Sequence, residues 1–190
     1  MTFLPENYDL PKTNSKYMKL EKGANKFRVL DNAVTGYIYW NVDNKPVRQE
    51  EQFDFLPADI RMEADKDGKT TPSRIKHFWA FPVWDYSDSQ VKILEITQSS
   101  IQSALKSKVE NRNGVATGND IVITRSGDGL GTDYEVDMLD ASPLTPEIKK
   151  VWEATSIDLT ALFRGDDPYS TTTTTTAKVD SEVDVEDIPF

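Results

Sequence analysis

The stretch from residue 75 to residue 86, Ile-Lys-His-Phe-Trp-Ala-Phe-Pro-Val-Trp-Asp-Tyr, combines the side chains that proteins use to bind unpaired bases. Aromatic rings stack on bases, and the adjacent cations Arg74 and Lys76 could contact phosphates. If the stretch is a β-strand, alternate side chains point to opposite faces, so its aromatics divide between two faces. One face would pack on a core and leave the other open to a ligand. The alternative is that both faces are buried, because aromatic residues dominate protein cores.

Two sets of side chains extend this interpretation to the neighbouring predicted strands. The candidates for base stacking are Tyr37, Tyr39, Trp40, Phe78, Trp79, Phe81, Trp84 and Tyr86. The candidates for phosphate contacts are Lys45, Arg48, Arg61, Arg74, Lys76 and Arg125. Because every base has a π face and phosphates are uniform, we expect weak sequence preference and binding that falls steeply with salt. The sequence does not say which aromatics belong to the core, and we expect about half of them there.

The elements that would position these residues are mostly strands. Alternating or apolar runs predict strands at residues 27–30, 36–41, 46–53, 75–86, 91–97, 121–125 and 134–138. An apolar stripe at helical spacing predicts a helix over residues 99–111, with Thr97 and Ser99 as N-cap candidates. Shorter helical segments are expected at 57–64, 143–154 and 158–163. This pattern predicts a mainly β protein, an OB-fold-like barrel of five to six strands with one inserted helix and short C-terminal helices. Residues 54–74 and the strand at 91–97 are interpreted as additions to the minimal five-stranded fold.

Three polar or glycine-rich segments carry no cofactor or metal site. Residues 31–32 are typical of a turn, and residues 126–132 of a hairpin tip. The latter segment lacks the Gly-Lys-Ser/Thr ending and the following helix of a phosphate-binding loop. Residues 65–69 begin like a calcium loop but lack its later ligands. We therefore expect no cofactor and no metal.

Composition excludes several classes of function. The 190-residue chain has no cysteine, which removes disulfides, thiolate metal sites and cysteine nucleophiles. His77 is the only histidine, and no nucleophile–base spacing stands out, so we do not expect an enzyme. No signal peptide and no apolar run of roughly 20 residues is visible, which favours a soluble cytoplasmic protein without membrane contact.

The net charge of −10 is unevenly distributed, and it suggests a division of the chain. From residue 166 onward seven acids face only one lysine, which marks an acidic interaction tail. We expect a basic N-terminal arm (1–22), an ssDNA-binding domain (23–140), a helical extension (141–165) and a threonine-rich linker with the acidic tail (166–190). The lysines of the arm are Lys12, Lys16, Lys19 and Lys22. They could contact phosphates or a neighbour's acidic tail, or only be solvated.

The end of the chain resembles a known recruitment element. The residues Asp184, Val185, Glu186, Asp187, Ile188, Pro189 and Phe190 resemble the acidic tip of bacterial single-stranded-DNA-binding proteins. In that family the terminal Phe and its carboxylate dock in basic-rimmed apolar pockets of replication, repair and recombination enzymes. The resemblance implies partner binding by Asp184, Glu186, Asp187, Ile188, Pro189 and Phe190.

The body, over roughly residues 20 to 140, resembles phage-encoded single-stranded-DNA-binding proteins with an OB-fold. The likeness lies in residues 27–30, 36–40, 45–48, 77–86 and 93–99. It implies a non-catalytic protein that coats single-stranded DNA during phage replication, recombination or repair in the host-cell cytoplasm. A bacterial tetramer is not implied, and a homo-oligomer is left open. The alternative is a protein-interaction adaptor or acidic DNA mimic that acts only through its tail, in which case the body binds no oligonucleotide.

Overall fold

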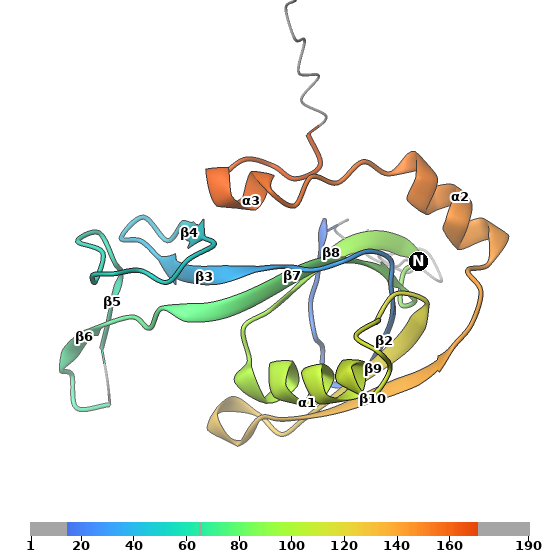
Figure 1. The fold of residues 1–190 in the computed structure, drawn as a ribbon. Helices are drawn as coiled ribbons and strands as arrows, with labels where there is room; N and C mark the ends of the chain where they lie inside the picture. The colour runs from blue at the N-terminus through green and yellow to red at the C-terminus, as the bar shows by residue number, and fades with distance from the viewer. Residues whose placement is uncertain (1–14, 65, 171–190) are drawn as a thin grey trace, which may run out of the picture.

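The computed structural model describes residues 15–64 and 66–170 of the chain. These residues form one eight-stranded sheet, a separate two-stranded sheet and three α-helices (Figure 1). The strands are β1 (Tyr17–Met18), β2 (Gly23–Val29), β3 (Val34–Trp40), β4 (Pro46–Gln49), β5 (Met62–Ala64), β6 (Thr70–Pro72), β7 (Lys76–Asp85), β8 (Gln90–Ile96), β9 (Asn119–Ser126) and β10 (Asp133–Ala141). The helices are α1 (Ser99–Glu110), α2 (Pro146–Ala154) and α3 (Ala161–Arg164), and Gly129–Gly131 form a 3-10 turn. The expected mainly β, OB-like class is confirmed, although the main sheet has more strands than the expected five to six.

The aromatic strand β7 is central to the main sheet. It pairs with β8 along one edge and with β2 and then β3 along the other, all antiparallel. Because β2 and β3 run in the same direction along β7, residues 30–33 do not reverse the chain. Leu30 N–H still donates to Pro82 O at 3.0 Å, so these residues bulge out of one continuous, bent strand. The turn expected at residues 31–32 is therefore wrong: the polar residues sit in a bulge.

The helix α1 lies against the inner face of the curved sheet, between β8 and β9 in the chain (Figure 1). Its apolar stripe places Ile101 and Leu105 in the main core, with Phe27 and Phe81 from the sheet. This confirms the helix that the apolar spacing predicts. The expected capping by Thr97 or Ser99 is wrong, since Gln98 is the N-cap residue and its side chain makes no cap hydrogen bond.

The segment between β4 and β7 differs from its prediction. Residues 57–64 were expected to be helical, but Ile60 pairs with Asn41 in a β-bridge and residues 62–64 form strand β5. Val42 N–H donates to Asp59 O at 2.8 Å and Arg61 N–H donates to Trp40 O at 2.8 Å. These backbone bonds to the end of β3 replace the bonds of a helix. Strand β4 is also shorter than expected and ends at Gln49.

The C-terminal extension comprises residues 142–170 in the structure, so residues 166–170, which were expected to begin the linker, belong to the folded part. It covers the outer face of the sheet, opposite α1 (Figure 1). Leu162 of α3 packs with Phe78 and Ile93, and Ile148 of α2 packs with Trp84. Phe163 lies so close to Gly36 that a Cβ atom there would approach its ring to 3.0 Å and the Gln49 carbonyl oxygen to 2.3 Å. The extension is thus part of the folded core.

Two hydrogen bonds fix where the extension leaves β10. Arg28 on β2 donates from Nη1 to the Ser142 carbonyl oxygen at 2.7 Å and from Nη2 to Ser142 Oγ at 2.6 Å. Its Nε donates to Asp120 on β9. One buried guanidinium therefore links two strands to the first residue of the extension.

Candidate nucleic-acid interface

Four of the eight stacking candidates are buried: Tyr39, Phe78, Phe81 and Trp84 are each at most 5% exposed. Phe81 faces the inner core and lies 6.4 Å from the Phe27 ring. Phe78 and Trp84 face outward, but the C-terminal extension covers them. No base can reach these rings in this structure. For most of β7, both faces are therefore buried, which is the alternative that the sequence left open.

Three further candidates are half-buried and already have partners. Tyr37 contacts His77 edge-on at 5.2 Å between ring centroids, and Trp79 packs against the main core. The Tyr86 hydroxyl donates to Asp120 at 2.9 Å, while Lys26 Nζ lies 4.5 Å from the Tyr86 ring centroid. Burial and the Asp120 carboxylate raise the pKa of Tyr86. These contacts leave Trp40, 41% exposed, as the most accessible of the candidates.

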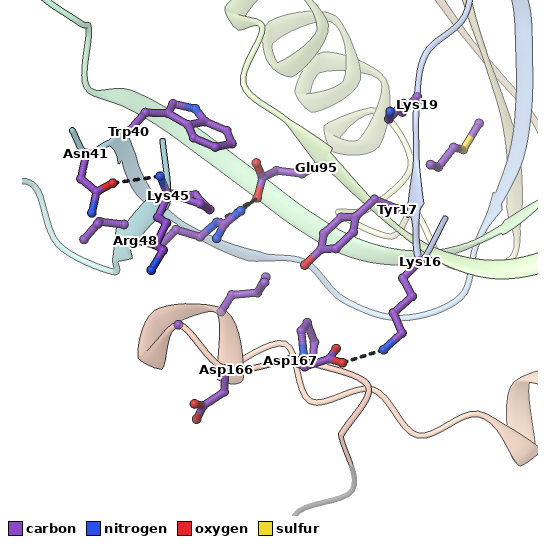
Figure 2. A pocket seen from close by; sticks show the side chains of 16 residues that line it. Lys16, Tyr17, Lys19, Trp40, Asn41, Lys45, Arg48, Glu95, Asp166 and Asp167 are labelled. Atoms are coloured by element: carbon purple, nitrogen blue, oxygen red, sulfur yellow. Dashed lines mark hydrogen bonds and ion pairs between the residues drawn. The ribbon is translucent and has the colours of Figure 1, made fainter. Parts of the chain in front are cut away.

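Trp40 lies on a groove of about 940 Å³ (Figure 2). The groove runs between β1, the β3–β4 hairpin and the C-terminal extension. It is lined by Lys16, Tyr17, Met18, Lys19, Trp40, Asn41, Lys45, Pro46, Val47, Arg48, Glu95, Leu162, Gly165, Asp166, Asp167 and Pro168. Three predicted site residues, Trp40, Lys45 and Arg48, meet here. The combination of an exposed indole with several cations is suited to a nucleic-acid strand.

A tight hairpin positions Trp40 and Lys45. Trp40 is paired with Pro46 across the β3–β4 ladder. The Asn41 side-chain oxygen accepts hydrogen bonds from the backbone N–H groups of Lys45 at 2.9 Å and Asp43 at 3.1 Å. Asn44 completes the turn with a φ of 57° in the left-handed region, which Asn tolerates better than most residues. Trp40 and Lys45 therefore enter the groove from the two strands of one tightly hydrogen-bonded hairpin.

The cations of the groove differ in availability. Arg48 forms an ion pair with Glu95 at 2.8 Å, and its side chain is only 9% exposed. Lys16 forms an ion pair with Asp167 at 2.6 Å. Within residues 15–64 and 66–170, neither Lys19 nor Lys45 forms an ion pair. Both side chains are exposed, so these two are the cations most available to a phosphate.

The remaining phosphate candidates lie outside the groove. Arg61 is paired with Glu63 at 2.5 Å and donates to Asn44 at 3.2 Å, and Arg125 donates to the Leu20 carbonyl oxygen at 3.1 Å. Arg74 and Lys76 are exposed at the start of β7. Ile38 is paired with Lys76 on one side and with Arg48 on the other, so Lys76 lies on the same outer face as the groove.

Tyr17 lines the groove but was not among the predicted site residues. It belongs to β1, which pairs in parallel with β8 through Tyr17 and Ile93. The stretch expected to be an arm therefore contributes a strand to the sheet. An aromatic between Lys16 and Lys19 was a usable signal, but its place depends on a pairing that no local pattern indicates.

Burial raises the pKa of the Tyr17 hydroxyl and raises that of Tyr169 to about 12. Both phenols therefore stay neutral at physiological pH, and neither adds negative charge to the groove. The Tyr169 hydroxyl donates to the Lys16 carbonyl oxygen at 2.7 Å. Tyr169 thereby ties the extension to β1 at the edge of the groove.

Other predicted features lie outside the described residues: Lys12 of the arm, the threonine run from residue 171, and the six tail residues Asp184, Glu186, Asp187, Ile188, Pro189 and Phe190. Among the residues that are described, no group of His, Cys, Asp or Glu side chains is arranged to hold a metal ion. None of the described helices has the length and apolar character required to span a bilayer.

Comparison with known proteins gives one informative match. No family model matches the chain, and no solved structure matches it. A curated protein of Escherichia phage T5, described as "Probable ssDNA-binding protein", is 26% identical over 145 residues. The match covers 66% of this chain and 56% of the phage protein, so the chain spans about half the length of this relative.

Proposed function

We propose that this protein binds single-stranded DNA without strong sequence preference and has no catalytic role. The observation that carries the proposal is the exposed Trp40 beside Lys45 on the groove. A tryptophan at 41% exposure presents a ring face that any base can stack on, worth roughly 1–3 kcal/mol per base. The description of the phage T5 relative supports the same ligand.

The form of the groove favours one flexible strand. Bases would stack against Trp40 and Tyr17, while phosphates would reach Lys45 and Lys19. If these two lysines and Lys76 each neutralise one phosphate, the logarithm of affinity should fall with the logarithm of salt at a slope of about −2. Because the hairpin already holds the backbone of Trp40 in place, the protein itself loses little conformational entropy on binding.

The cellular role that we propose is protection of single-stranded DNA during phage replication, recombination or repair in the host-cell cytoplasm. The tail residues Asp184, Glu186, Asp187, Ile188, Pro189 and Phe190 would recruit partner enzymes. Their resemblance to the bacterial tip supports this part of the proposal. A terminal aromatic supplies buried area, and the preceding acids steer the encounter with a basic partner.

A tryptophan-fluorescence titration with oligo-dT, beside an equal amount of duplex, tests the proposal. The single strand should quench the tryptophan fluorescence of the wild-type chain strongly at low salt and less at moderate salt. Trp40→Phe should lose most of this quenching. Trp152→Phe is the matched control, because Trp152 lies on α2 away from the groove. Its removal should leave the fluorescence loss on adding oligo-dT, and the affinity derived from it, unchanged. Absence of binding to the single strand at both salt concentrations would overturn the proposal in favour of the adaptor.

A further inference from the structure

We propose that Asp166 and Asp167 make the groove selective for one strand over two. The inference rests on the proposed function, since it concerns the same groove. Both carboxylates belong to the wall formed by the C-terminal extension. A second phosphate backbone lying on that wall would meet negative charge, whereas a lone strand can keep its phosphates on the other side.

The two walls of the groove differ in charge. Figure 2 shows Trp40 and Lys19 on one side of Tyr17, and Asp166 and Asp167 on the other. Lys45 and Lys19 are unpaired within the described residues and can accept a phosphate. The cations nearest the acidic wall are already engaged, Lys16 by Asp167 at 2.6 Å and Arg164 by Asp166 at 3.2 Å. A second backbone therefore finds no unpaired cation on this wall among the described groove residues.

The acidic wall is fixed in position. Leu162, just before the acids, is 3% exposed in the outer core. Gly165 ends α3 with a φ of 73°, and Asp166 N–H donates to the Ala161 carbonyl oxygen at 3.0 Å. Beyond the acids, Asp158 N–H donates to the Pro168 carbonyl oxygen at 2.8 Å. Swinging the wall away would break these bonds and expose apolar side chains, so the carboxylates stay where a ligand meets them.

Asp167 keeps its negative charge at neutral pH. The hydrogen bond from Lys16, and a second from Tyr169 N–H at 3.0 Å, hold the pKa of Asp167 below its ordinary value. Lys16 and Arg164 offset part of this charge, but Arg164 is shared between Asp158 and Asp166, so three carboxylates face two cations. The wall therefore keeps a net negative charge that an incoming phosphate meets. Duplex DNA carries two backbones on opposite sides of its bases, about one charge per 1.7 Å of axis, and it cannot keep both away from the wall. Selectivity then comes from repelling the wrong ligand, as in many specific interfaces.

A different role for the same residues makes a different prediction. Suppose that Asp167 acts only by occupying Lys16 until a phosphate of either ligand replaces it. Neutralising the acids would then strengthen single-strand and duplex binding by the same factor. A fixed repelling wall strengthens duplex binding selectively. The ratio of the two affinities therefore separates the two mechanisms.

The test uses the full chain with Asp166→Asn and Asp167→Asn combined, titrated at low salt with oligo-dT and with a mixed-sequence duplex of equal length. Duplex affinity should rise about tenfold and single-strand affinity less than about threefold. The matched control is Asp133→Asn with Glu135→Gln, which removes two exposed charges on β10, outside the groove, and should leave the ratio unchanged. Equal gains for both ligands, or no gain for the duplex, would overturn the proposal.

Two further measurements keep the test decisive. Asp166→Asn alone leaves the Asp167–Lys16 ion pair intact, so it should raise duplex affinity in the same direction even if the double variant folds poorly. If the wild-type chain binds no single strand, it is the proposed function that fails. If it binds the single strand and the ratio does not change in the variants, only the role of Asp166 and Asp167 is overturned.

Discussion

Arg48 on β4 donates from Nε to one carboxylate oxygen of Glu95 on β8 at 2.9 Å, and its Nη2 lies 2.8 Å from the same oxygen in an ion pair. The two side chains are 9% and 19% exposed, and the guanidinium lies 5.7 Å from the Phe78 ring centroid. The ion pair thus crosses the outer face of the sheet beneath the groove. Arg48 was a candidate for phosphate contact, but its charge is already balanced, and its position makes it part of the floor that supports Trp40 and Lys45.

Arg48→Ala should lower the free energy of unfolding by about 2–4 kcal/mol, because it leaves the Glu95 carboxylate largely buried without its cation. Urea unfolding at neutral pH measures the change. Lys149→Ala, which breaks an exposed helical pair with Glu153, is the control and should cost less than about 0.5 kcal/mol. Unchanged stability together with lost oligo-dT binding would instead make Arg48 a direct phosphate contact.

Lys45→Ala should weaken oligo-dT binding without changing stability. The side chain is exposed and, within the described part of the chain, unpaired. Loss of one phosphate contact should make the salt slope of binding shallower by about 0.7. Titrations at several salt concentrations measure the slope, with Lys150→Ala on the exposed face of α2 as the control. A slope equal to that of the wild type would exclude Lys45 from the contact.

The sequence predicts well those parts of the fold that depend on local patterns. The β9–β10 hairpin forms with Tyr134 opposite Arg125 and Met138 opposite Ile121, because its two alternating runs flank a glycine-rich tip. The helix at residues 99–110 follows from its apolar stripe. Trp40 and Lys45 are candidates because aromatic and basic residues adjoin a short hairpin turn, and the structure places both on the groove. Their contact with DNA stays a prediction.

The remaining features depend on contacts between distant parts of the chain. Phe78 and Trp84 alternate along β7 as an exposed platform would, and only the packing of α2 and α3 on them decides their burial. The bulge at residues 30–33 uses the same residue types as a turn. Tyr17 enters the groove through a two-residue parallel pairing that is too short to carry a pattern.

Asp120→Asn should lower the free energy of unfolding at neutral pH and make it depend less on pH in the acid range. Burial alone would raise the pKa of Asp120, but hydrogen bonds from Arg28, Lys26 and Tyr86 outweigh burial and hold that pKa below its ordinary value. A depressed folded-state pKa gives stability that is present above the unfolded pKa and is lost as pH falls through the folded pKa. The carboxylate therefore stabilises the fold at pH 7, and this contribution should fade below about pH 4.

The free energy of unfolding at pH 7 and pH 3 measures this effect. In Asp120→Asn the value at pH 7 should fall by about 3 kcal/mol, since the buried Arg28 loses its charged partner. The difference between the two pH values should shrink relative to the wild type. Asp31→Asn, an exposed acid in the bulge, is the control and should keep the wild-type difference. The same difference in Asp120→Asn as in the wild type would show that other acids govern acid unfolding.

Removal of residues 180–190 should abolish recruitment of partner enzymes and leave oligo-dT affinity unchanged or tighter. The truncation deletes five acids and one terminal aromatic, so it reduces the negative charge that opposes DNA. Pull-down of basic replication enzymes and oligo-dT titration measure the two effects. Phe190→Ala is the finer variant, because it keeps every acid. Weaker DNA binding after truncation would contradict this role for the tail.

Leu162→Ala should destabilise the whole protein, because the C-terminal extension belongs to its core. Leu162 is 3% exposed and packs with Phe78 and Ile93, so truncation to Ala should cost about 2–4 kcal/mol in the free energy of unfolding. Val151→Ala on the exposed face of α2, 37% exposed, is the control and should cost much less. If the extension were a separate appendage, Leu162→Ala would leave the main unfolding transition unchanged. A single transition that moves as a unit would show that the C-terminal extension unfolds together with the sheet whose outer face it covers.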